Sequence, residues 1–125
     1  MDREARTSAS RGKRRLRIIK ELVSSRQYNY SKKVRSLIED GYFDEEDMER
    51  CVLSATTIHK VEPDELGTAI DGRKYTIIGI DTQGRSFYTC GKLIRRSESE
   101  KLYFFITAHE EGFEYEQRTG GYGNG

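Results

Sequence analysis

Apolar residues in the first half of the chain recur three or four positions apart, which is the spacing of one face of an α-helix. Three such stripes occur, and they consist of Leu16, Ile19, Leu22 and Val23; of Val34, Leu37 and Ile38; and of Met48, Cys51 and Val52. Ser31 and Asp44 precede the second and third stripes, and side chains of their type cap helix N-termini. The pattern therefore predicts helices over residues 14 to about 26, 31–41 and 44–55.

The pattern changes after residue 55 to short runs rich in β-branched and aromatic residues, which are typical of strands. Four strands are predicted, over residues 56–61, 74–80, 86–93 and 102–109. The step Asp71-Gly72 is a strong indication of a hairpin turn between the first two. Helices followed by consecutive strands indicate an α+β fold, with two to three N-terminal helices packed on one face of a roughly four-stranded antiparallel sheet.

Composition divides the chain into three parts. We expect a disordered basic arm at residues 1–13, a single α+β domain at 14–111, and a flexible glycine-rich tail at 112–125. The first 20 residues carry eight basic and two acidic side chains, whereas the net charge of the whole chain is +1. A basic segment on a mildly acidic body favours contact with a polyanion or an acidic partner, and the alternative is a solvated tail.

Several classes of protein and site are disfavoured by the composition. No run approaches the roughly 18 apolar residues of a membrane span, and the N-terminus lacks the apolar region of a secretory signal. We therefore expect a cytoplasmic protein with no membrane partner. Cys51 and Cys90 belong to no CxxC pair and do not cluster with the two histidines. This favours reduced, buried thiols and predicts neither a metal site nor a cofactor.

Alternation along the last predicted strand separates its side chains into two faces. An apolar face, which we expect to pack against the helices, is formed by Leu102, Phe104, Ile106 and Ala108. The opposite face, which we expect to be open, carries Tyr103, Phe105, Thr107 and His109. Such a face suits single-stranded nucleic acid, because bases stack on aromatic rings while cations neutralise phosphates. The predicted nucleic-acid-binding residues are Tyr103, Phe105, Lys92, Arg14 and Arg15.

The same open face also suggests ribonuclease chemistry. His109 has an ordinary pKa near neutrality and can act as a general acid or base. Tyr88 lies on the preceding predicted strand and Arg85 at its start. Cleavage of RNA through its 2′-hydroxyl needs a base, an acid and a cation for the charged transition state. The alternative is that His109 is an exposed residue at a strand end without a catalytic role.

Four segments resemble a small bacterial domain family of unknown function. They are YSKKV at residues 30–34, EDME at 46–49, the strand at 75–79 and FFITAHE at 104–110, so the resemblance covers roughly residues 16–111. That family is similar in layout to the BrnT and RelE toxins, and its genes often sit beside zinc-finger antitoxins of the MqsA type. The resemblance implies a RelE-like microbial ribonuclease fold, with cleavage of mRNA, often at the ribosome, and an antitoxin that covers the active face.

The chain departs from this family at two positions of the second predicted helix. The family typically has a His-Ala pair where this chain has Lys33-Val34, and often an arginine where this chain has Leu37. Lys33 retains a positive charge, but a lysine of ordinary pKa is a poor general base. If the family's histidine and arginine are its functional groups, this chain has lost them.

Three hypotheses for function result. The first is a toxin-like, RNA-directed module, a metal-independent ribonuclease with His109, Lys33, Tyr88 and Arg85 around the open sheet face. The second is a non-catalytic protein of the same fold that binds a protein or nucleic acid through the sheet face and the basic N-terminal arm. The third is a regulatory module whose tails carry recognition. The expected partners are RNA or the ribosome and an antitoxin-like protein.

Overall fold

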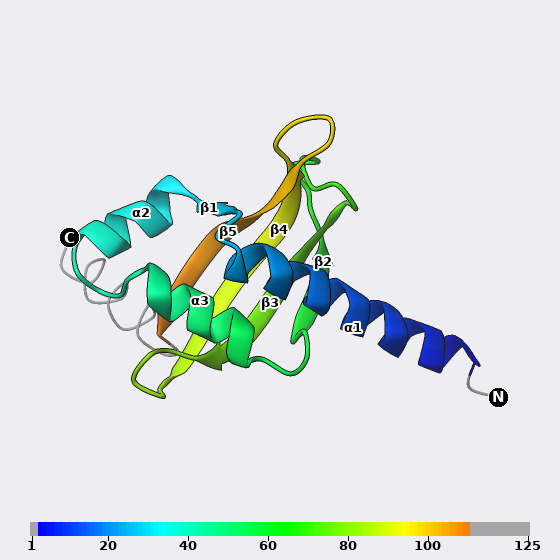
Figure 1. The fold of residues 1–125 in the computed structure, drawn as a ribbon, viewed down its shortest axis with the longest axis horizontal. Coiled ribbons are helices and arrows are strands. Elements are labelled where there is room, and N and C mark those ends of the chain that lie inside the picture. The colour runs from blue at the N-terminus through cyan, green and yellow to red at the C-terminus, as the bar shows by residue number, and fades with distance from the viewer. Residues whose placement is uncertain (1–2, 111–125) are drawn as a thin grey trace.

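Three helices and five strands make up residues 3–110, the part of the chain that the computed structural model describes. In chain order they are α1 (Arg3–Ser24), β1 (Tyr28–Tyr30), α2 (Lys32–Glu39), α3 (Glu45–Ser54), β2 (Lys60–Pro63), β3 (Arg73–Ile80), β4 (Ser86–Arg95) and β5 (Lys101–Glu110). The strands form one sheet in the order β1-β5-β4-β3-β2. Helices α1 and α3 lie across one face of this sheet (Figure 1). The predicted α+β class is confirmed.

The sheet has one more strand than predicted and is mixed rather than antiparallel. β1 runs parallel to β5, and all other neighbouring strands are antiparallel. A strand of three residues is too short to show an alternation of side chains, so β1 could not be recognised from the sequence between the first two helices. β2 begins at Lys60 rather than at residue 56, because the preceding residues connect the end of α3 to the sheet edge.

The predicted helix caps are present and also join the helices to the sheet. Ser31 Oγ accepts a hydrogen bond from Val34 N at 3.2 Å and donates one to the Ile106 carbonyl of β5 at 2.9 Å. Asp44 and Asp47 form a reciprocal capping box at the start of α3. The Asp47 carboxylate also accepts hydrogen bonds from the backbone N–H and the hydroxyl of Thr82, in the turn between β3 and β4.

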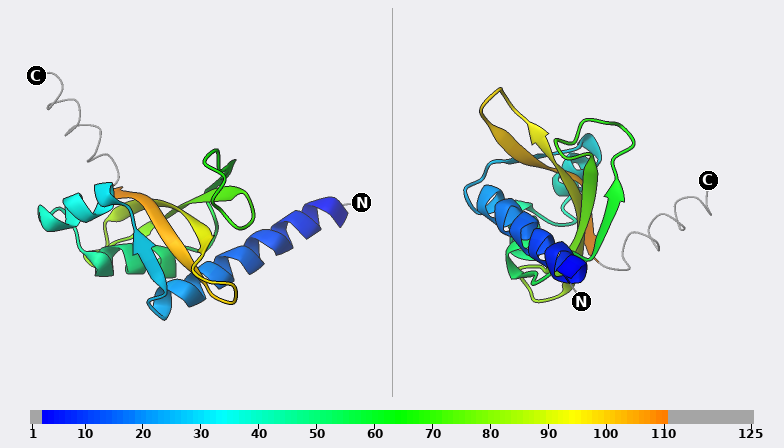
Figure 2. Two further views of the ribbon diagram at one scale, coloured as in Figure 1. Left: turned by 90° about the horizontal axis from the view of Figure 1, so that it is seen from above. Right: turned by 90° about the vertical axis from the view of Figure 1, so that its right-hand side faces the viewer.

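Helix α1 is longer than the apolar pattern predicts. It begins at Arg3, so residues 3–13, for which the sequence predicts a disordered arm, are part of this helix. This segment contains alanine, arginine, lysine and glutamate, which favour helix, and no proline. The apolar stripe starts only at Leu16 because the N-terminal part of α1 extends past the sheet (Figure 2). The predicted tail at 112–125 lies outside the described residues.

A β-bulge in β5 decides which of its side chains enter the core. The register of β4 and β5 shifts between Cys90 and Gly91, which leaves Ile106 as the extra residue. On the N-terminal side of the bulge, Tyr103 and Phe105 face the helices and are fully buried. The extra residue reverses the alternation, so the positions whose side chains face the helices differ between the two sides of the bulge.

The prediction that Phe104 and Ile106 share the core face is therefore wrong, and so is the prediction that Tyr103 and Phe105 form an open face. Ala108, beyond the bulge, belongs to the core as predicted. A strict alternation of two cannot anticipate an inserted residue.

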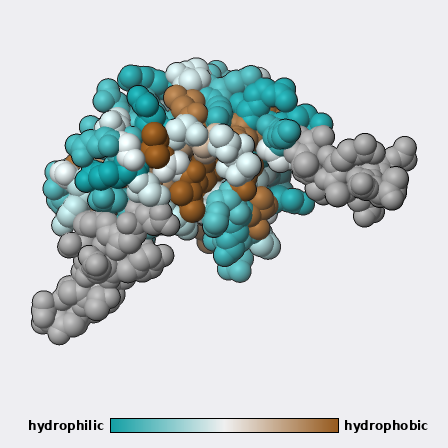
Figure 3. Space-filling view, turned by 90° about the horizontal axis from the view of Figure 1, so that it is seen from below, coloured by the Kyte–Doolittle hydropathy of each residue, from teal (hydrophilic) through white to brown (hydrophobic). Residues whose placement is uncertain are grey.

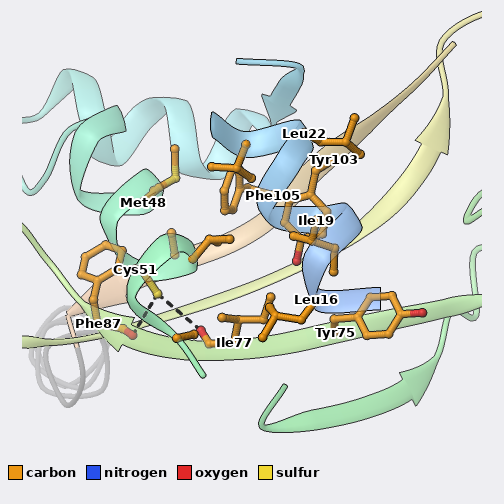
Figure 4. Close-up of a cluster of buried hydrophobic side chains, with 14 of the residues drawn as sticks. Leu16, Ile19, Leu22, Met48, Cys51, Tyr75, Ile77, Phe87, Tyr103 and Phe105 are labelled. Carbon is orange, nitrogen blue, oxygen red and sulfur yellow. Dashed lines mark hydrogen bonds between the residues drawn. The ribbon is translucent and has the colours of Figure 1, made fainter. Parts of the chain in front are cut away.

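The core lies between the helices and the sheet, where α3 approaches β3 and β4 closely (Figure 4). The thiol of Cys51 lies 3.5 Å from the Ile77 carbonyl oxygen and 3.3 Å from that of Phe87. Burial raises the pKa of Cys51 to about 12 and also raises the pKa of Cys90. The prediction of free, buried cysteines is confirmed.

The surface of the described residues has no extended apolar area on the face seen from below, where hydrophobic residues form small patches among hydrophilic ones (Figure 3). The exposed large hydrophobic side chains are Tyr42, Leu53, Val61, Leu66, Ile70 and Ile80. None of the helices within residues 3–110 has the combination of length and apolarity that crossing a bilayer requires.

Candidate nucleic-acid interface

A cleft of about 750 Å³ opens between α1, the connector before β2, and the edge of the sheet formed by β2 and β3. Among the described residues, its lining includes the cations Arg11, Lys13, Arg15 and Arg73 and one carboxylate, that of Asp71. A concave surface lined by one sign of charge concentrates ligands of the opposite sign. Within the described part of the chain, this cleft is therefore a candidate site for an anionic ligand.

Helical spacing and core packing together direct the α1 cations into the cleft. Arg11 and Arg15 are four positions apart, so they lie on the same side of α1. Leu16 is buried beside Tyr75 in the core (Figure 4), and this contact fixes the rotation of α1 about its axis. Arg73 reaches the cleft from the start of β3. The site therefore joins two segments that are far apart in sequence.

Asp71 is held inside this cationic cleft by three donors. Its carboxylate lies 3.4 Å from Arg15 Nε and accepts a hydrogen bond from the Arg73 backbone N–H at 3.1 Å. The hydroxyl of Tyr75 also donates to it. Burial and this hydrogen bond raise the pKa of Tyr75 to about 12, so the hydroxyl is protonated and remains a donor at neutral pH.

Of the two predicted α1 cations, Arg15 lines the cleft and Arg14 does not. Arg14 lies on the exposed side of α1, where it adds to the positive potential around the cleft without lining it. Lys13, Arg11 and Arg73 were not predicted as site residues. The i, i+4 spacing of Arg11 and Arg15 was the available indication, but only the fold brings Arg73 opposite them.

Tyr103 and Phe105 cannot stack on bases in this structure. Both side chains are 0% exposed, and their rings pack edge to face at a centroid distance of 5.1 Å. Phe105 makes a second edge-to-face contact with Tyr28 at 5.4 Å. The predicted aromatic platform is therefore wrong, because these rings fill the core beneath α1 and α3.

Lys92 is also withdrawn from solvent and does not present its charge to a ligand. Its ammonium lies 3.2 Å from Asp64 Oδ1, and the two side chains are 5% and 3% exposed. Asp64 also accepts hydrogen bonds from the backbone N–H groups of Thr68 and Ala69. Burial raises the pKa of Asp64, but the Ala69 N–H and the Lys92 ammonium outweigh it and hold that pKa below its usual range. The pair secures the loop between β2 and β3.

The predicted catalytic residues come together only in part. Tyr88 and His109 are cross-strand partners whose rings stack at 4.5 Å, and His109 is buried rather than exposed. Arg85 lies near this end of the sheet, but it pairs with Asp81 at 3.1 Å and with Glu110 at 3.5 Å.

The nitrogen His109 Nδ1 lies 3.0 Å from the Glu110 carbonyl oxygen. Since a carbonyl only accepts, Nδ1 carries the proton in the neutral ring and Nε2 is the acceptor. Lys33 lies on the exposed side of α2. The arrangement therefore places the buried His109 imidazole against the Tyr88 ring, near an arginine that is paired with two carboxylates.

Comparison of the chain with protein-family models, with curated proteins and with solved structures finds no match in any of the three. The resemblance noted in the sequence therefore remains an expectation, and the functional assignment depends on the geometry of the residues themselves.

Proposed function

We propose that the protein binds single-stranded RNA through the cleft between α1 and the β2–β3 edge of the sheet. The observation that carries this proposal is the lining of the cleft, where the described residues include four cations and one carboxylate. Neutralisation of phosphates by lysine and arginine supplies most of the affinity in sequence-independent binding. The resemblance to toxin families favours a toxin–antitoxin system, in which such a module acts on RNA and has an antitoxin-like partner.

Two features favour a polyanion over a small anion as the ligand. The positive charge continues along α1 beyond the cleft, because Arg14 and Arg17 lie on its exposed side. The cleft is also lined by the Thr56 and Thr57 side chains and by the Val61 and Leu16 side chains, which supply hydroxyl and apolar contacts for sugars and bases.

Reversing two cleft charges tests the proposal. In the double variant Arg11→Glu/Lys13→Glu, affinity for a single-stranded RNA oligonucleotide is expected to fall at least about tenfold. The slope of log affinity against log salt should also flatten by about 1.4, since each single-strand phosphate contact contributes about 0.7. Fluorescence anisotropy at several salt concentrations measures both quantities.

The matched control is Arg96→Glu/Lys101→Glu, which makes the same charge change at exposed positions around the β4–β5 turn, away from the cleft. Its affinity should stay within about twofold of the unmodified protein at physiological salt, where charges beyond roughly 8 Å are largely screened. Equal losses in the two double variants would mean that only net charge matters and that the cleft is not the binding site.

A second candidate function is metal-independent RNA cleavage at the end of the sheet where β4 begins and β5 ends. The stacked pair Tyr88 and His109 favours this function. In this reaction a base takes the 2′-hydroxyl proton, the 2′-oxygen attacks phosphorus, and the 5′-oxygen leaves and is protonated. His109 would be the base. The proton on the 5′-oxygen would come from a tyrosine or from water.

Growth assays test this second function. Strong induction of the gene in a bacterium is expected to arrest growth, and His109→Ala and His109→Gln are both expected to relieve the arrest by removing the base. His109→Gln keeps a side chain of similar size at this buried position, so circular dichroism of the purified variants separates lost chemistry from lost folding. Normal growth of cells that accumulate the unmodified protein would exclude a toxic ribonuclease.

A further inference from the structure

Asp71 is the only carboxylate among the described residues that line the cleft, and its position is unusual. Its side chain is 17% exposed and that of Arg15 is 36% exposed, so the pair lies at the surface of the cleft, within reach of a ligand. The Nε–Oδ2 distance of 3.4 Å is longer than that of a well-formed charged hydrogen bond. Arg15 is therefore held loosely and can exchange one anionic partner for another.

We propose that Asp71 is an internal competitor of the ligand, and that an RNA phosphate takes the place beside Arg15 that this carboxylate holds in the free protein. The inference rests on the proposed RNA-binding function and names the phosphate subsite within it. Asp71 keeps the Tyr75 hydroxyl and the Arg73 backbone N–H as donors when Arg15 turns to the phosphate. Release of Arg15 therefore leaves no unpaired carboxylate.

Gly12 provides a second observation at the same place. It lies within α1 and lines the cleft next to Arg11, although glycine inside a helix is less stable than alanine. A Cβ atom added there would meet no heavy atom within 4 Å, so packing within the protein does not require glycine. The absent side chain leaves space for a phosphodiester backbone to approach the helix between Arg11 and Arg15.

The competing explanation is that the Arg15–Asp71 pair serves as a structural clasp that holds α1 against β3. The two explanations predict opposite effects of neutralising Asp71. A clasp that is broken loosens α1 and disorders the cleft, which weakens RNA binding. A competitor that is removed frees Arg15 and strengthens RNA binding.

The test is Asp71→Asn, which removes the charge while the amide oxygen still accepts a hydrogen bond. Affinity for a single-stranded RNA oligonucleotide is expected to rise about three- to fivefold, the effect of releasing one partly exposed ion pair. The salt slope should become steeper by up to about 0.7, for one additional phosphate contact. The control is Glu65→Gln in the same loop, an exposed carboxylate outside the cleft lining, for which the rise should stay below about twofold.

Unchanged or reduced affinity in a folded Asp71→Asn protein would overturn the inference, and so would an equal rise in Glu65→Gln. Thermal unfolding verifies that the variant is folded. Failure of this inference is distinguishable from failure of the proposed function. If Arg11→Glu/Lys13→Glu abolishes binding while Asp71→Asn does not improve it, the cleft binds RNA and Asp71 is a clasp.

Discussion

Replacing Gly79 with alanine is expected to lower the free energy of unfolding by about 3 kcal/mol, the upper end of the usual cost of overpacking. Gly79 lies in β3 where α3 crosses it. A Cβ atom there would be 2.1 Å from the Cys51 carbonyl oxygen, 2.6 Å from Ser54 Oγ and 2.9 Å from the Cys51 carbonyl carbon. The nearest atoms belong to the backbone of a packed helix, so the strain can be relieved only by moving α3. Urea denaturation followed by circular dichroism measures the loss.

Two companion variants sharpen this prediction. Ser54→Ala in the Gly79→Ala background should not restore stability, because Cys51, and not Ser54, supplies the closest atom. Ser54 Oγ also accepts a hydrogen bond from Ile80 N at 3.0 Å, which the second change would remove. In contrast, Gly12→Ala should raise stability by about 0.5–1 kcal/mol, because it places a better helix former where no atom obstructs it. A Gly79→Ala protein as stable as the unmodified one would mean that α3 does not approach β3 this closely.

The position of Gly79 also shows which parts of the fold the sequence could predict. Apolar stripes such as Val34, Leu37 and Ile38 identify the helices because the core must receive them. Caps such as Ser31 and Asp44 mark helix ends because backbone N–H groups there lack partners. These are local rules; α2 and α3 obey both of them, and the apolar stripe identifies the C-terminal part of α1. The need for glycine at position 79 arises from a helix in a distant segment, and no local pattern contains it.

The same distinction explains the errors at the sheet. The bulge at Ile106 exists because β4 and β5 shift register between Cys90 and Gly91, which is a relation between two strands. Gly91 is itself required by this arrangement, because a Cβ atom there would be 2.5 Å from the ring of Tyr103. The aromatic ring of Tyr103 occupies the space that Gly91 leaves free. Alternation within β5 alone could not reveal that dependence.

The candidate site illustrates the same limit. The basic character of the N-terminal segment was evident from the sequence, and it gave Arg15 and Arg14 as candidates. The cleft itself needs Arg73 and Asp71 opposite α1, and these are brought there by the pairing of β2 with β3 and by the packing of Leu16. The positive charge of the N-terminal segment was therefore predictable, whereas the concave surface along which the fold places this charge was not.

The assignment of Phe105 to the core leads to the second large effect. Phe105→Ala is expected to lower the free energy of unfolding by about 3–5 kcal/mol, since it opens a cavity at a fully buried aromatic position. It also removes the edge-to-face contacts with Tyr28 and Tyr103. A domain of this size is stable by only about 5–15 kcal/mol, so this one change should remove a large share of the total. Urea denaturation provides the measurement.

Phe104→Ala is the matched control, because it truncates the same side chain one position earlier, on the opposite and partly exposed face of β5. Its cost should be about 1 kcal/mol, near the centre of the distribution for single substitutions. Had Phe105 formed an open platform for bases and Phe104 the core, the order of the two stabilities would be reversed. RNA binding separates the alternatives again: Phe105→Leu, which retains most of the buried volume, should bind RNA like the unmodified protein at temperatures where it is folded. A selective loss of RNA affinity in folded Phe105→Leu would mean that Phe105 belongs to the RNA interface. It would also mean that RNA binds the sheet face and not the α1 cleft.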